Sequence, residues 1–526
     1  MNETYIRCGD TKLDALFPRI KAFLLKGISE YNMFGREVRG YRSPDAPSLW
    51  LRDYSDMMRA FRYWEHDMKS VVDHFAETQT EKGWIFDYFT MTPEKVPCEK
   101  ENWAKYVRVP VEADVEFRFI KAIHMAWQAT GDDAWVRRLL PKMEKALNYI
   151  LTDEWRWDKK TKLVKRGFSI DTWDFDYTAG RHPWLNFQLN EHTFWGIMHG
   201  DNSGYYESFM HMSALYRNTG HYARARYWER YAAAFRKRAN KLCFNGRFYK
   251  HHVHLVRVKI DGVDESDQLS LSNPMDINRG LATHEIAVAI LKEYQRRAET
   301  TRAFAEWFSI DPPFPDGIYG DEKIVGGAYC NGGIMPLVGG ELARAAFEHG
   351  FEEYGIAQLR KYADLTGNNE SYLWYFPDGK HATIETSTSP DASPTDAWGS
   401  SAMVYALIEG LAGVVDSGRL FKHVRLSPRW LSAGRDEAQV RCMYGATGAS
   451  IEYAYSHNPS SQSMEIDVKG NADVDLHLLL PRGTKAVSVS LNGKKNRFFT
   501  RKVESSPYVD TSFRMKKHCS IEIHYQ

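Results

Sequence analysis

The chain has 526 residues, which is long enough for one large domain followed by a smaller one. It carries 69 Lys and Arg against 68 Asp and Glu, so its net charge is close to zero and no basic stripe suggests nucleic acid as a partner. No run of 18 or more apolar residues predicts a membrane span, and the N-terminus lacks the apolar core of a signal peptide. We therefore expect a soluble, cytoplasmic protein.

The six cysteines are widely scattered, without a CxxC pair or a Cys/His spacing that suits structural zinc. Sparse cysteines in a long chain are typical of a reducing compartment. The cluster His251-His252-x-His254 has alternating spacing, which predicts a surface hairpin rather than a metal site. We expect neither a metal nor a cofactor.

Apolar residues recur at helical spacing through most of the first 400 residues. The expected helices form pairs with short breaks, and long irregular segments join the pairs; their ranges are 11–30, 48–78, 110–130, 134–153, 207–218, 223–242, 283–296, 301–308, 337–350, 352–366 and 402–415. Glu112, Asp114 and Glu116 are interpreted as a solvated helix face or helix start. This pattern predicts eleven or twelve helices arranged as nested hairpins and closed into a ring.

After Gly418 the sequence changes to an alternation of apolar and polar residues, as in Met464-Glu-Ile466-Asp-Val468. Turn residues such as Asn492-Gly493 separate these runs. This part of the sequence predicts an antiparallel β-sandwich. We expect a mainly α chain with an (α/α)6 toroid over residues 1–418 and a small sandwich over residues 419–526. The sandwich has no acid cluster, so we expect it to be a structural cap.

Acids alternate with aromatics between Phe168 and Tyr177, in the order Asp171-Thr-Trp173-Asp174-Phe-Asp176. Aromatic faces can stack on the rings of a ligand, and an apolar wall raises a carboxyl pKa towards the range of a general acid. The chain has 16 Trp and 29 Tyr, which fits a ring-stacking ligand. A surface loop with incidental acids is the alternative interpretation.

Three further segments combine aromatic, charged and small residues. Trp50-Leu-Arg52-Asp53 begins a helix, where a Trp face and an Arg/Asp pair can bind a sugar. A Gly-rich turn at 326–336 contains Asn331, which offers both a donor and an acceptor. Glu385 precedes a polar loop that leads into Trp398-Gly-Ser-Ser.

These segments resemble motifs of the six-hairpin (α/α)6 glycoside hydrolases, a group that includes trehalases, glucoamylases, processing α-glucosidases and α-L-rhamnosidases. Trp50-Leu-Arg52-Asp53 resembles the Trp-x-Arg-Asp motif that lines the sugar subsite of glucoamylase-like barrels. Trp173-Asp174-Phe175 resembles the segment around the general-acid Asp of trehalases.

Two motifs nearer the C-terminus extend the resemblance. Asn331-Gly-Gly-Ile-Met-Pro336 resembles an Asn-Gly-Gly-x-x-Pro motif found in many members. Glu385, a polar loop and Trp398-Gly-Ser-Ser-Ala resemble the catalytic-base Glu and the start of the last barrel helix. The C-terminal sandwich resembles the one that closes α-L-rhamnosidases.

The sequence also departs from these families. The Glu-Ser-Gly that precedes Trp-Asp-Phe in trehalases is replaced by Ile170-Asp171-Thr172. The Asp-Glu-Arg-x-Gly-Trp general-acid motif of α-L-rhamnosidases is absent. The resemblance therefore predicts the six-hairpin group without selecting one family within it.

The resemblance implies a glycoside hydrolase that cleaves an α-linked oligosaccharide or glycoside, with exo-acting, inverting chemistry. Inverting hydrolysis needs a general acid and a general base about 6.5–9.5 Å apart. Asp174, between two aromatics, is predicted to be the acid, and Glu385, in a polar loop, the base. Asp171 and Asp176 remain alternative acids.

The predicted substrate-binding residues are aromatic, charged or amide side chains: Trp50, Arg52, Asp53, Asp87, Trp173, Asp201, Tyr205, Asn331 and Trp398. Other functions are open: a polysaccharide lyase or an inverting phosphorylase on the same toroid, or a non-catalytic carbohydrate-binding protein. The substitution Glu385→Gln separates these functions, because only hydrolysis is expected to be abolished by it.

Overall fold

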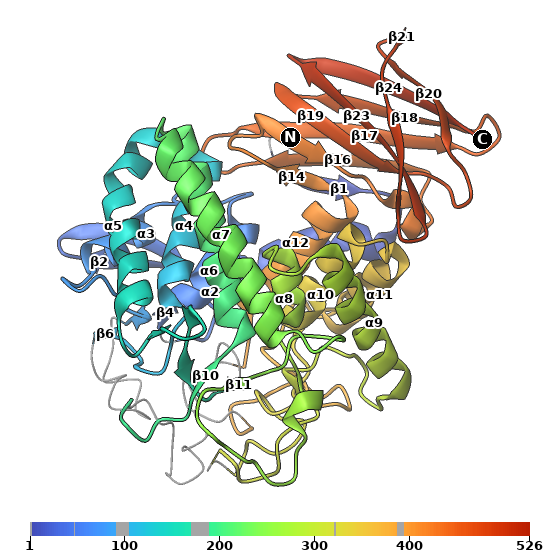
Figure 1. The fold of residues 1–526 in the computed structure, drawn as a ribbon. Coiled ribbons are helices and arrows are strands. Elements are labelled where there is room, and N and C mark those ends of the chain that lie inside the picture. Colours follow the sequence, from blue (N-terminus) through green and yellow to red (C-terminus); the bar gives the residue numbers. More distant parts are fainter. Residues whose placement is uncertain (1–2, 47, 91–104, 170–188, 320–321, 387–393) are drawn as a thin grey trace.

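A computed structural model describes residues 3–46, 48–90, 105–169, 189–319, 322–386 and 394–526. Asp171, Trp173, Asp174 and Asp176 lie outside these ranges. The described residues contain twelve α-helices and two large β-sheets. Figure 1 shows the helices in the lower body of the molecule and the sheets above them.

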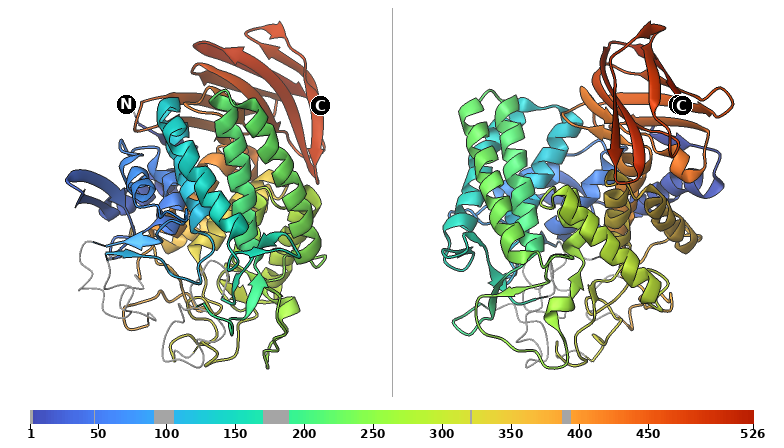
Figure 2. Two further views of the ribbon diagram at one scale, coloured as in Figure 1. Left: turned by 60° about the vertical axis from the view of Figure 1, so that its left-hand side comes forward. Right: turned by 45° about the vertical axis from the view of Figure 1, so that its right-hand side comes forward.

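Six helices form a closed inner ring, because each contacts the next and the last contacts the first. They are α2 (Leu51–Phe61), α4 (Val115–Thr130), α6 (His199–Asn218), α8 (Ser272–Asn278), α10 (Pro336–Glu348) and α12 (Ala397–Tyr405). An outer helix follows or precedes each of them: α1 (Thr11–Leu24), α3 (Ser70–Glu77), α5 (Asp133–Thr152), α7 (Tyr222–Cys243), α9 (His284–Thr300) and α11 (Glu352–Leu365). The predicted (α/α)6 toroid is confirmed, and Figure 2 shows its helix pairs from two further sides.

The inner and outer helices bury different shares of their surfaces. Outer helix α5 buries one stripe at helical spacing, which includes Trp135, Leu139 and Met143. Inner helix α4 is buried all round. Glu112, Asp114 and Glu116, at the start of α4, are fully buried, so the prediction of a solvated face was wrong. A sequence pattern cannot reveal that neighbouring helices cover the polar side of a helix.

The ring has one end with short connections and one end with long connections. At the first end, 131–132, 219–221, 279–283 and 349–351 join inner to outer helices. At the other end, 25–50, 78–114, 153–198, 244–271, 301–335 and 366–396 lead into the next inner helix. Every inner helix therefore begins at the end with the long connections. The sheets pack at the opposite end, where Asp133 pairs with Arg419 and Glu348 with Arg429.

Two twisted sheets form the predicted sandwich. The seven-stranded sheet has the order β1 (Tyr5–Arg7), β16 (Glu437–Met443), β17 (Ser450–Asn458), β18 (Ser463–Lys469), β24 (His518–Tyr525), β20 (Ala486–Leu491), β21 (Lys494–Lys495). The five-stranded sheet has the order β14 (Val414–Asp416), β15 (His423–Leu426), β19 (Ala472–Leu479), β23 (Ser506–Met515), β22 (Phe499–Val503). All pairs are antiparallel except β15 with β19. The N-terminal strand β1 pairs with β16, so the first and last strands of the chain, β1 and β24, belong to the same sheet. The division at residue 418 stays a prediction.

Short strands lie within the long connections. They are β2 (Ile28–Met33) with β3 (Arg36–Tyr41), β4 (Leu49–Trp50) with β5 (Tyr88–Phe89) and β6 (Tyr106–Val107), β7 (Trp157–Asp158) with β8 (Leu163–Val164), β9 (Arg166–Gly167) with β10 (Trp195–Ile197) and β11 (Val253–His254), and β12 (Leu269–Ser270) with β13 (Ile310–Asp311). Two helix predictions were wrong here: 48–78 contains two helices, α2 and α3, and 301–308 contains none. No helix in the described parts of the chain is long and apolar enough to cross a membrane.

Candidate active site

The N-termini of the inner helices collect charged residues at the end with the long connections. Arg52 and Asp53 lie in the first turn of α2, Asp114 directly precedes α4, Asp201 lies in the first turn of α6, and Asp396 caps α12. Unpaired N–H groups and the helix dipole make such positions favourable for carboxylates. The toroid therefore gathers acids from separate parts of the chain.

Arg52 is the centre of a buried ion-pair network. Its Nε and Nη2 atoms donate to the two carboxylate oxygens of Asp114 at 2.8 and 3.1 Å, and Nη2 lies 2.6 Å from Glu112 Oε2. Burial raises the pKa of Asp114, but Arg52 and Arg118 outweigh burial and hold it well below its usual range. The bidentate geometry fixes the guanidinium, so Arg52 presents a rigid edge at the end of the ring.

Asp53, the next residue, has no hydrogen-bond partner among the described residues and is only half-buried. Burial raises its pKa to about 6, although Arg52 and Arg118 oppose this effect. Asp396 accepts from the N–H groups of Trp398 and Gly399 at 2.8 and 2.7 Å. Burial, together with the charge of Asp53, raises the pKa of Asp396 to about 7.

Asp53 and Asp396 are therefore neighbouring carboxyls that can carry a proton near neutral pH. Asp396 was not among the site residues predicted from the sequence. An Asp that directly precedes the apolar 397–411 segment is a helix-capping signal, and this signal could have found it.

Asp56, also on α2, links this helix to α4 and α12. It accepts from Arg118 Nη1 at 2.5 Å, Lys121 Nζ at 2.6 Å and Trp398 Nε1 at 2.7 Å. Burial raises the pKa of Asp56, but the three cations Arg118, Lys121 and Arg59 lower it well below its usual range. Trp398 is buried by this contact, so its orientation is set by α2 and α4 as well as by its own helix.

Other predicted binding residues lie in the same region, mostly inside the protein. Trp50 is half-buried and packs on Tyr88 with a centroid distance of 3.9 Å. Asp87 accepts from Val109 N–H at 2.7 Å, and burial raises its pKa to about 6 against the charges of Arg108 and Arg52. Direct contact of these residues with a substrate stays a prediction.

Asp201, Tyr205 and Asn331 are fully buried. Asp201 lies 3.3 Å from Arg166 Nη1, and the Tyr205 hydroxyl donates to the carbonyl of Ala113. The Asn331 side chain accepts from Phe314 N–H at 2.7 Å and donates to the carbonyl of the same residue at 3.0 Å. These contacts position the connections around the ring, and substrate binding by the three residues stays a prediction.

Glu385, the predicted base, is exposed in a turn at the end of the ring where α12 begins. Its own backbone N–H and the Thr383 hydroxyl lower its pKa, so the carboxylate is ionised. The predicted acid Asp174 and its alternatives Asp171 and Asp176 lie outside the described residues, as does Trp173. The separation between acid and base that inverting hydrolysis requires therefore stays a prediction.

A buried chain of hydrogen bonds joins α6 to α8. His199 Nδ1 lies 2.5 Å from Asp276 Oδ2, and its Nε2 lies 2.7 Å from Ser270 Oγ. The arrangement is similar to a Ser-His-Asp triad, but all three side chains are fully buried. Without access for a substrate, this group serves to align two inner helices.

The histidine cluster was wrongly predicted to lie on the surface. His251 and His252 are buried, and His254 binds Glu265 with Nε2 at 2.9 Å from a carboxylate oxygen. The predicted hairpin is also absent from the described part of the chain, because β11 has only two residues and pairs with β10, which lies far earlier in the chain. Phe168 packs on His252 and His254. Within the described ranges, no group of three or more His, Cys, Asp or Glu side chains is arranged to hold a metal ion.

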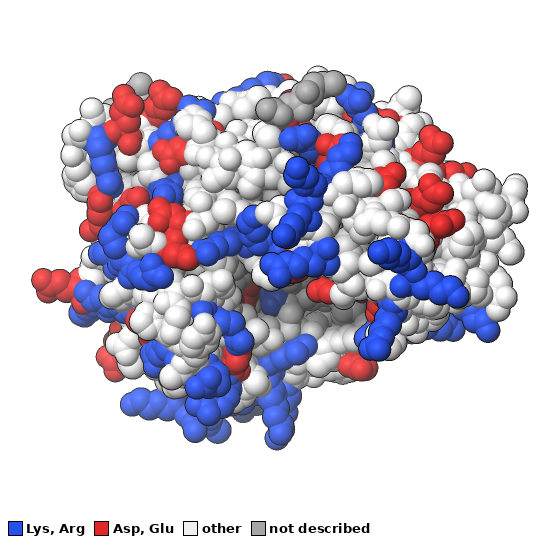
Figure 3. Space-filling view, turned by 90° about the horizontal axis from the view of Figure 1, so that it is seen from above, with Lys and Arg blue, Asp and Glu red and all other residues white. Residues whose placement is uncertain are grey.

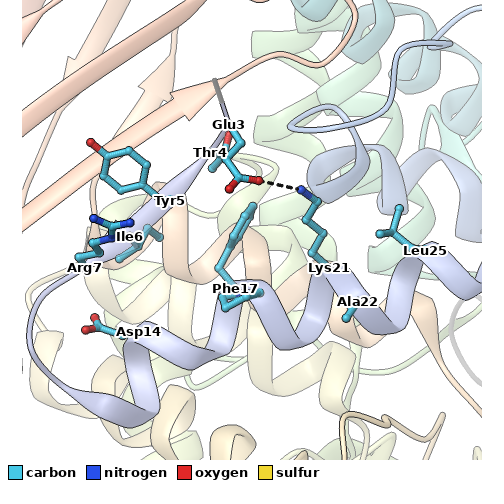
Figure 4. A pocket seen from close by; sticks show the side chains of 11 residues that line it. Glu3, Thr4, Tyr5, Ile6, Arg7, Asp14, Phe17, Lys21, Ala22 and Leu25 are labelled. Carbon is cyan, nitrogen blue, oxygen red and sulfur yellow. Dashed lines mark hydrogen bonds and ion pairs between the residues drawn. The ribbon is translucent and has the colours of Figure 1, made fainter. Parts of the chain in front are cut away.

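A separate groove of about 510 Å³ lies between β1 and α1 (Figure 4). Its two acids are already engaged, because Glu3 pairs with Lys21 and Asp14 accepts from the N–H groups of Cys8 and Gly9. The groove borders the sandwich through β1, so it is at the wrong end of the ring for the residues predicted from the sequence.

Comparison with solved structures identifies the fold. The α-L-rhamnosidase of Dictyoglumus thermophilum superimposes with a TM-score of 0.59 at 11% identity and covers 99% of this chain and 50% of that chain. A GH78 family rhamnosidase of a Bacillus species gives 0.59 at 16% identity, with coverage of 91% and 43%. The GH63 mannosylglycerate hydrolase of Thermus thermophilus in complex with glucose gives 0.51 at 14% identity, with coverage of 75% and 99%.

The chain therefore has the fold of the (α/α)6-barrel glycoside hydrolases with a C-terminal β domain. It spans about half the length of the rhamnosidases that it matches. No protein-family model and no curated protein sequence matches it. At these identities the likeness defines the fold, and the activity has to be argued from the site.

Proposed function

We propose that the chain is a glycoside hydrolase that cleaves an α-linked oligosaccharide or glycoside by an exo-acting, inverting mechanism. The observation that carries the proposal is the shared end of the ring: Arg52, Asp53 and Asp396 lie there, and the connections that contain Asp174 and Glu385 begin and end there. An acid and a base on two separate connections can approach a sugar from opposite faces.

In this mechanism Asp174 donates its proton to the glycosidic oxygen while the bond from that oxygen to the anomeric carbon breaks. Glu385 removes a proton from a water molecule whose oxygen attacks the anomeric carbon from the opposite face. The sugar leaves with inverted configuration. A base must be unprotonated before the reaction, and the lowered pKa of exposed Glu385 is compatible with this role.

Arg52 and Asp53 would bind sugar hydroxyls beside the reacting carbon. The bidentate contact with Asp114 leaves Arg52 little rotational freedom, and half-buried Asp53 has no other hydrogen-bond partner among the described residues. A polar side chain without a partner gains most from a hydroxyl that both donates and accepts. Trp50 would contribute the apolar surface on which a sugar ring packs.

The test is hydrolysis of α-L-rhamnosides, α-linked disaccharides and aryl α-glycosides, with the anomer of the product followed by NMR. We expect one sugar to appear first as the inverted anomer. Glu385→Gln and Asp174→Asn should each reduce kcat by at least about 1,000-fold, since each removes a group required in the transition state.

Asp378→Asn is the matched control, because Asp378 is also an exposed acid in the 366–396 connection. It should retain full activity. Asp171→Asn and Asp176→Asn identify the acid if Asp174→Asn stays active. Retention of configuration, or full activity of Glu385→Gln, would refute the mechanism.

A further inference from the structure

Side chains from all six inner helices line a cavity of about 220 Å³ on the axis of the ring. One residue from each helix illustrates this: Arg59, His124, His211, Asn278, Arg344 and Tyr405. Val415 and Asp416 of β14 also line the cavity, so it lies towards the sandwich. Figure 3 views the molecule from that side and shows a hollow near the middle, bordered by Lys and Arg.

The cavity is separate from the candidate active site. Asp56 and its bonds to Arg118, Lys121 and Trp398 lie between the cavity and the N-termini of the inner helices. Lys121 faces both regions, because its Nζ also lies 3.8 Å from Glu207 Oε2 in the cavity wall. A ligand in the cavity would therefore contact neither Arg52 nor Asp53, which do not line it.

The charges that line the cavity balance each other. Its basic residues are Arg59, Lys121, Arg279 and Arg344, and its acidic residues are Glu207, Glu341, Glu409 and Asp416. Arg59 pairs with Glu341, and Arg344 lies 3.6 Å from Glu409. The two histidines are neutral, since burial is the main cause that lowers the pKa of His211 to about 3 and that of His124 well below its usual value. This balance favours a neutral ligand over an ion.

Several polar atoms in the wall have no hydrogen-bond partner among the described residues. They come from five of the inner helices: Arg59 Nη2, His124 Nδ1, His211 Nε2, Asn278 Oδ1 and Arg344 Nε. The side chains of Arg59, His124 and Arg344 are each at least nine-tenths buried. Unsatisfied buried polar atoms are rare because each costs about 1–3 kcal/mol in general. Among these atoms, the arginine nitrogens donate, the amide oxygen accepts, and the imidazole nitrogens can do either. A hydroxyl group can pair with each of them, because it both donates and accepts.

The backbone is also irregular at this cavity. Helix α12 continues as a π-helical segment, Ala406–Leu411, which carries the lining residue Glu409. Arg62 Nη2 holds Glu409 at 2.6 Å. Segments of this type inside α-helices are uncommon and are frequent at functional sites.

We propose that the axial cavity binds one small neutral polyol, between glycerol and a monosaccharide in size. Hydroxyl groups satisfy the unpartnered nitrogen and oxygen atoms of the five helices, and the balanced wall charges favour a neutral ligand over an ion. The volume is smaller than that of pockets for drug-sized ligands and larger than a single water needs.

The experiment is isothermal titration of the full chain with glycerol, xylitol and D-glucose at up to about 10 mM, with inorganic phosphate and glycine as charged probes. His211→Phe keeps the ring that stacks on His124 and removes the free Nε2 atom. Met210→Gln, at an exposed position of the same helix, is the matched control. Asp53→Asn separates this site from the candidate active site.

We expect saturable binding of at least one polyol in the wild type, Met210→Gln and Asp53→Asn, and at least tenfold weaker binding in His211→Phe. Glu207→Gln, which keeps its shape, should weaken binding about threefold and serves as a second variant if His211→Phe does not fold. Binding that is lost in Asp53→Asn but kept in His211→Phe belongs to the candidate active site and overturns the proposal. Binding of phosphate or glycine in place of polyols would also overturn the proposal. The absence of saturable binding would overturn it as well, and would mean that only water fills the cavity.

Discussion

Burial of Asp53 disfavours the ionised form of its carboxyl group. Burial raises its pKa to about 6, and the carboxylates of Asp56 and Asp114 add to this effect. A group whose pKa is higher in the folded than in the unfolded chain stabilises the fold below the unfolded pKa and loses that contribution as the pH rises through the folded pKa. Ionised Asp53 therefore destabilises the protein at neutral pH, a property common to functional residues.

The substitution Asp53→Asn tests this destabilisation. A pKa shift of about two units corresponds to about 2.7 kcal/mol, and because Asp53 is half-buried we expect about 1 kcal/mol of added stability at pH 8. The gain should disappear near pH 4, where the folded wild type is protonated. The value of kcat/KM should fall about 10–100-fold. Urea unfolding at both pH values measures the first effect; an equal gain at pH 4 and pH 8 would contradict it.

Helices α10 and α12 approach each other closely at Gly340. A Cβ atom on Gly340 would lie 2.5 Å from the carbonyl carbon of Ala402, a backbone atom that cannot move aside. The ring closes through this pair and through α12 with α2. Gly340 therefore determines where the N-terminus of α12, with Asp396 and Trp398, lies relative to Arg52 and Asp53.

Gly340→Ala should destabilise the protein by about 2–3 kcal/mol, because the methyl group forces α10 and α12 apart. Better helix propensity of Ala offsets only about 1 kcal/mol of this loss. Gly367→Ala is the control, since the nearest atom to its Cβ would be 3.9 Å away and its φ is not in the left-handed region. Thermal unfolding followed by circular dichroism measures both; similar melting temperatures for the two variants would contradict the close approach.

The whole molecule is held together where the sandwich meets the end of the ring with short connections. Glu348 of α10 lies 2.9 Å from Arg429 Nη2, also pairs with Arg425, and is 3.6 Å from Arg344. Burial raises the pKa of Glu348, but these three arginines lower it well below its usual range. The folded state therefore favours ionised Glu348, and this stabilisation is lost as the pH falls from about 4.5 through the lowered pKa.

Glu348→Gln should cost about 3 kcal/mol at pH 7, because it leaves buried arginines without a carboxylate partner. The difference from the wild type should shrink at pH 3, where Glu348 in the unfolded wild type is protonated. Guanidinium unfolding at both pH values is the measurement. Glu353→Gln, which removes an exposed pair with Arg482, is the control and should change stability little. A constant difference across this pH range would argue against the ion-pair explanation.

The sequence predicted the helix pairs, the sandwich and the closed ring, because these depend on local periodicity and on the lengths of the breaks. Outer helices such as α5 and α7 expose one face, so their apolar stripes are visible in the sequence. Alternation after Gly418 is visible for the same reason, since one face of each strand is covered. The motifs around Arg52, Asp174 and Glu385 could be recognised because they are contiguous.

Which polar residues are buried, and which of them come into contact, depends on the packing of elements that are distant in the sequence. Glu112, Asp114 and His251 are covered by elements far away in the chain, and Asp396 becomes a neighbour of Asp53 only when α12 closes the ring on α2. The same is true of the axial cavity, whose wall takes one or more residues from each of six helices. Periodicity records which side of an element is apolar, whereas burial of charge depends on partners that local sequence does not contain.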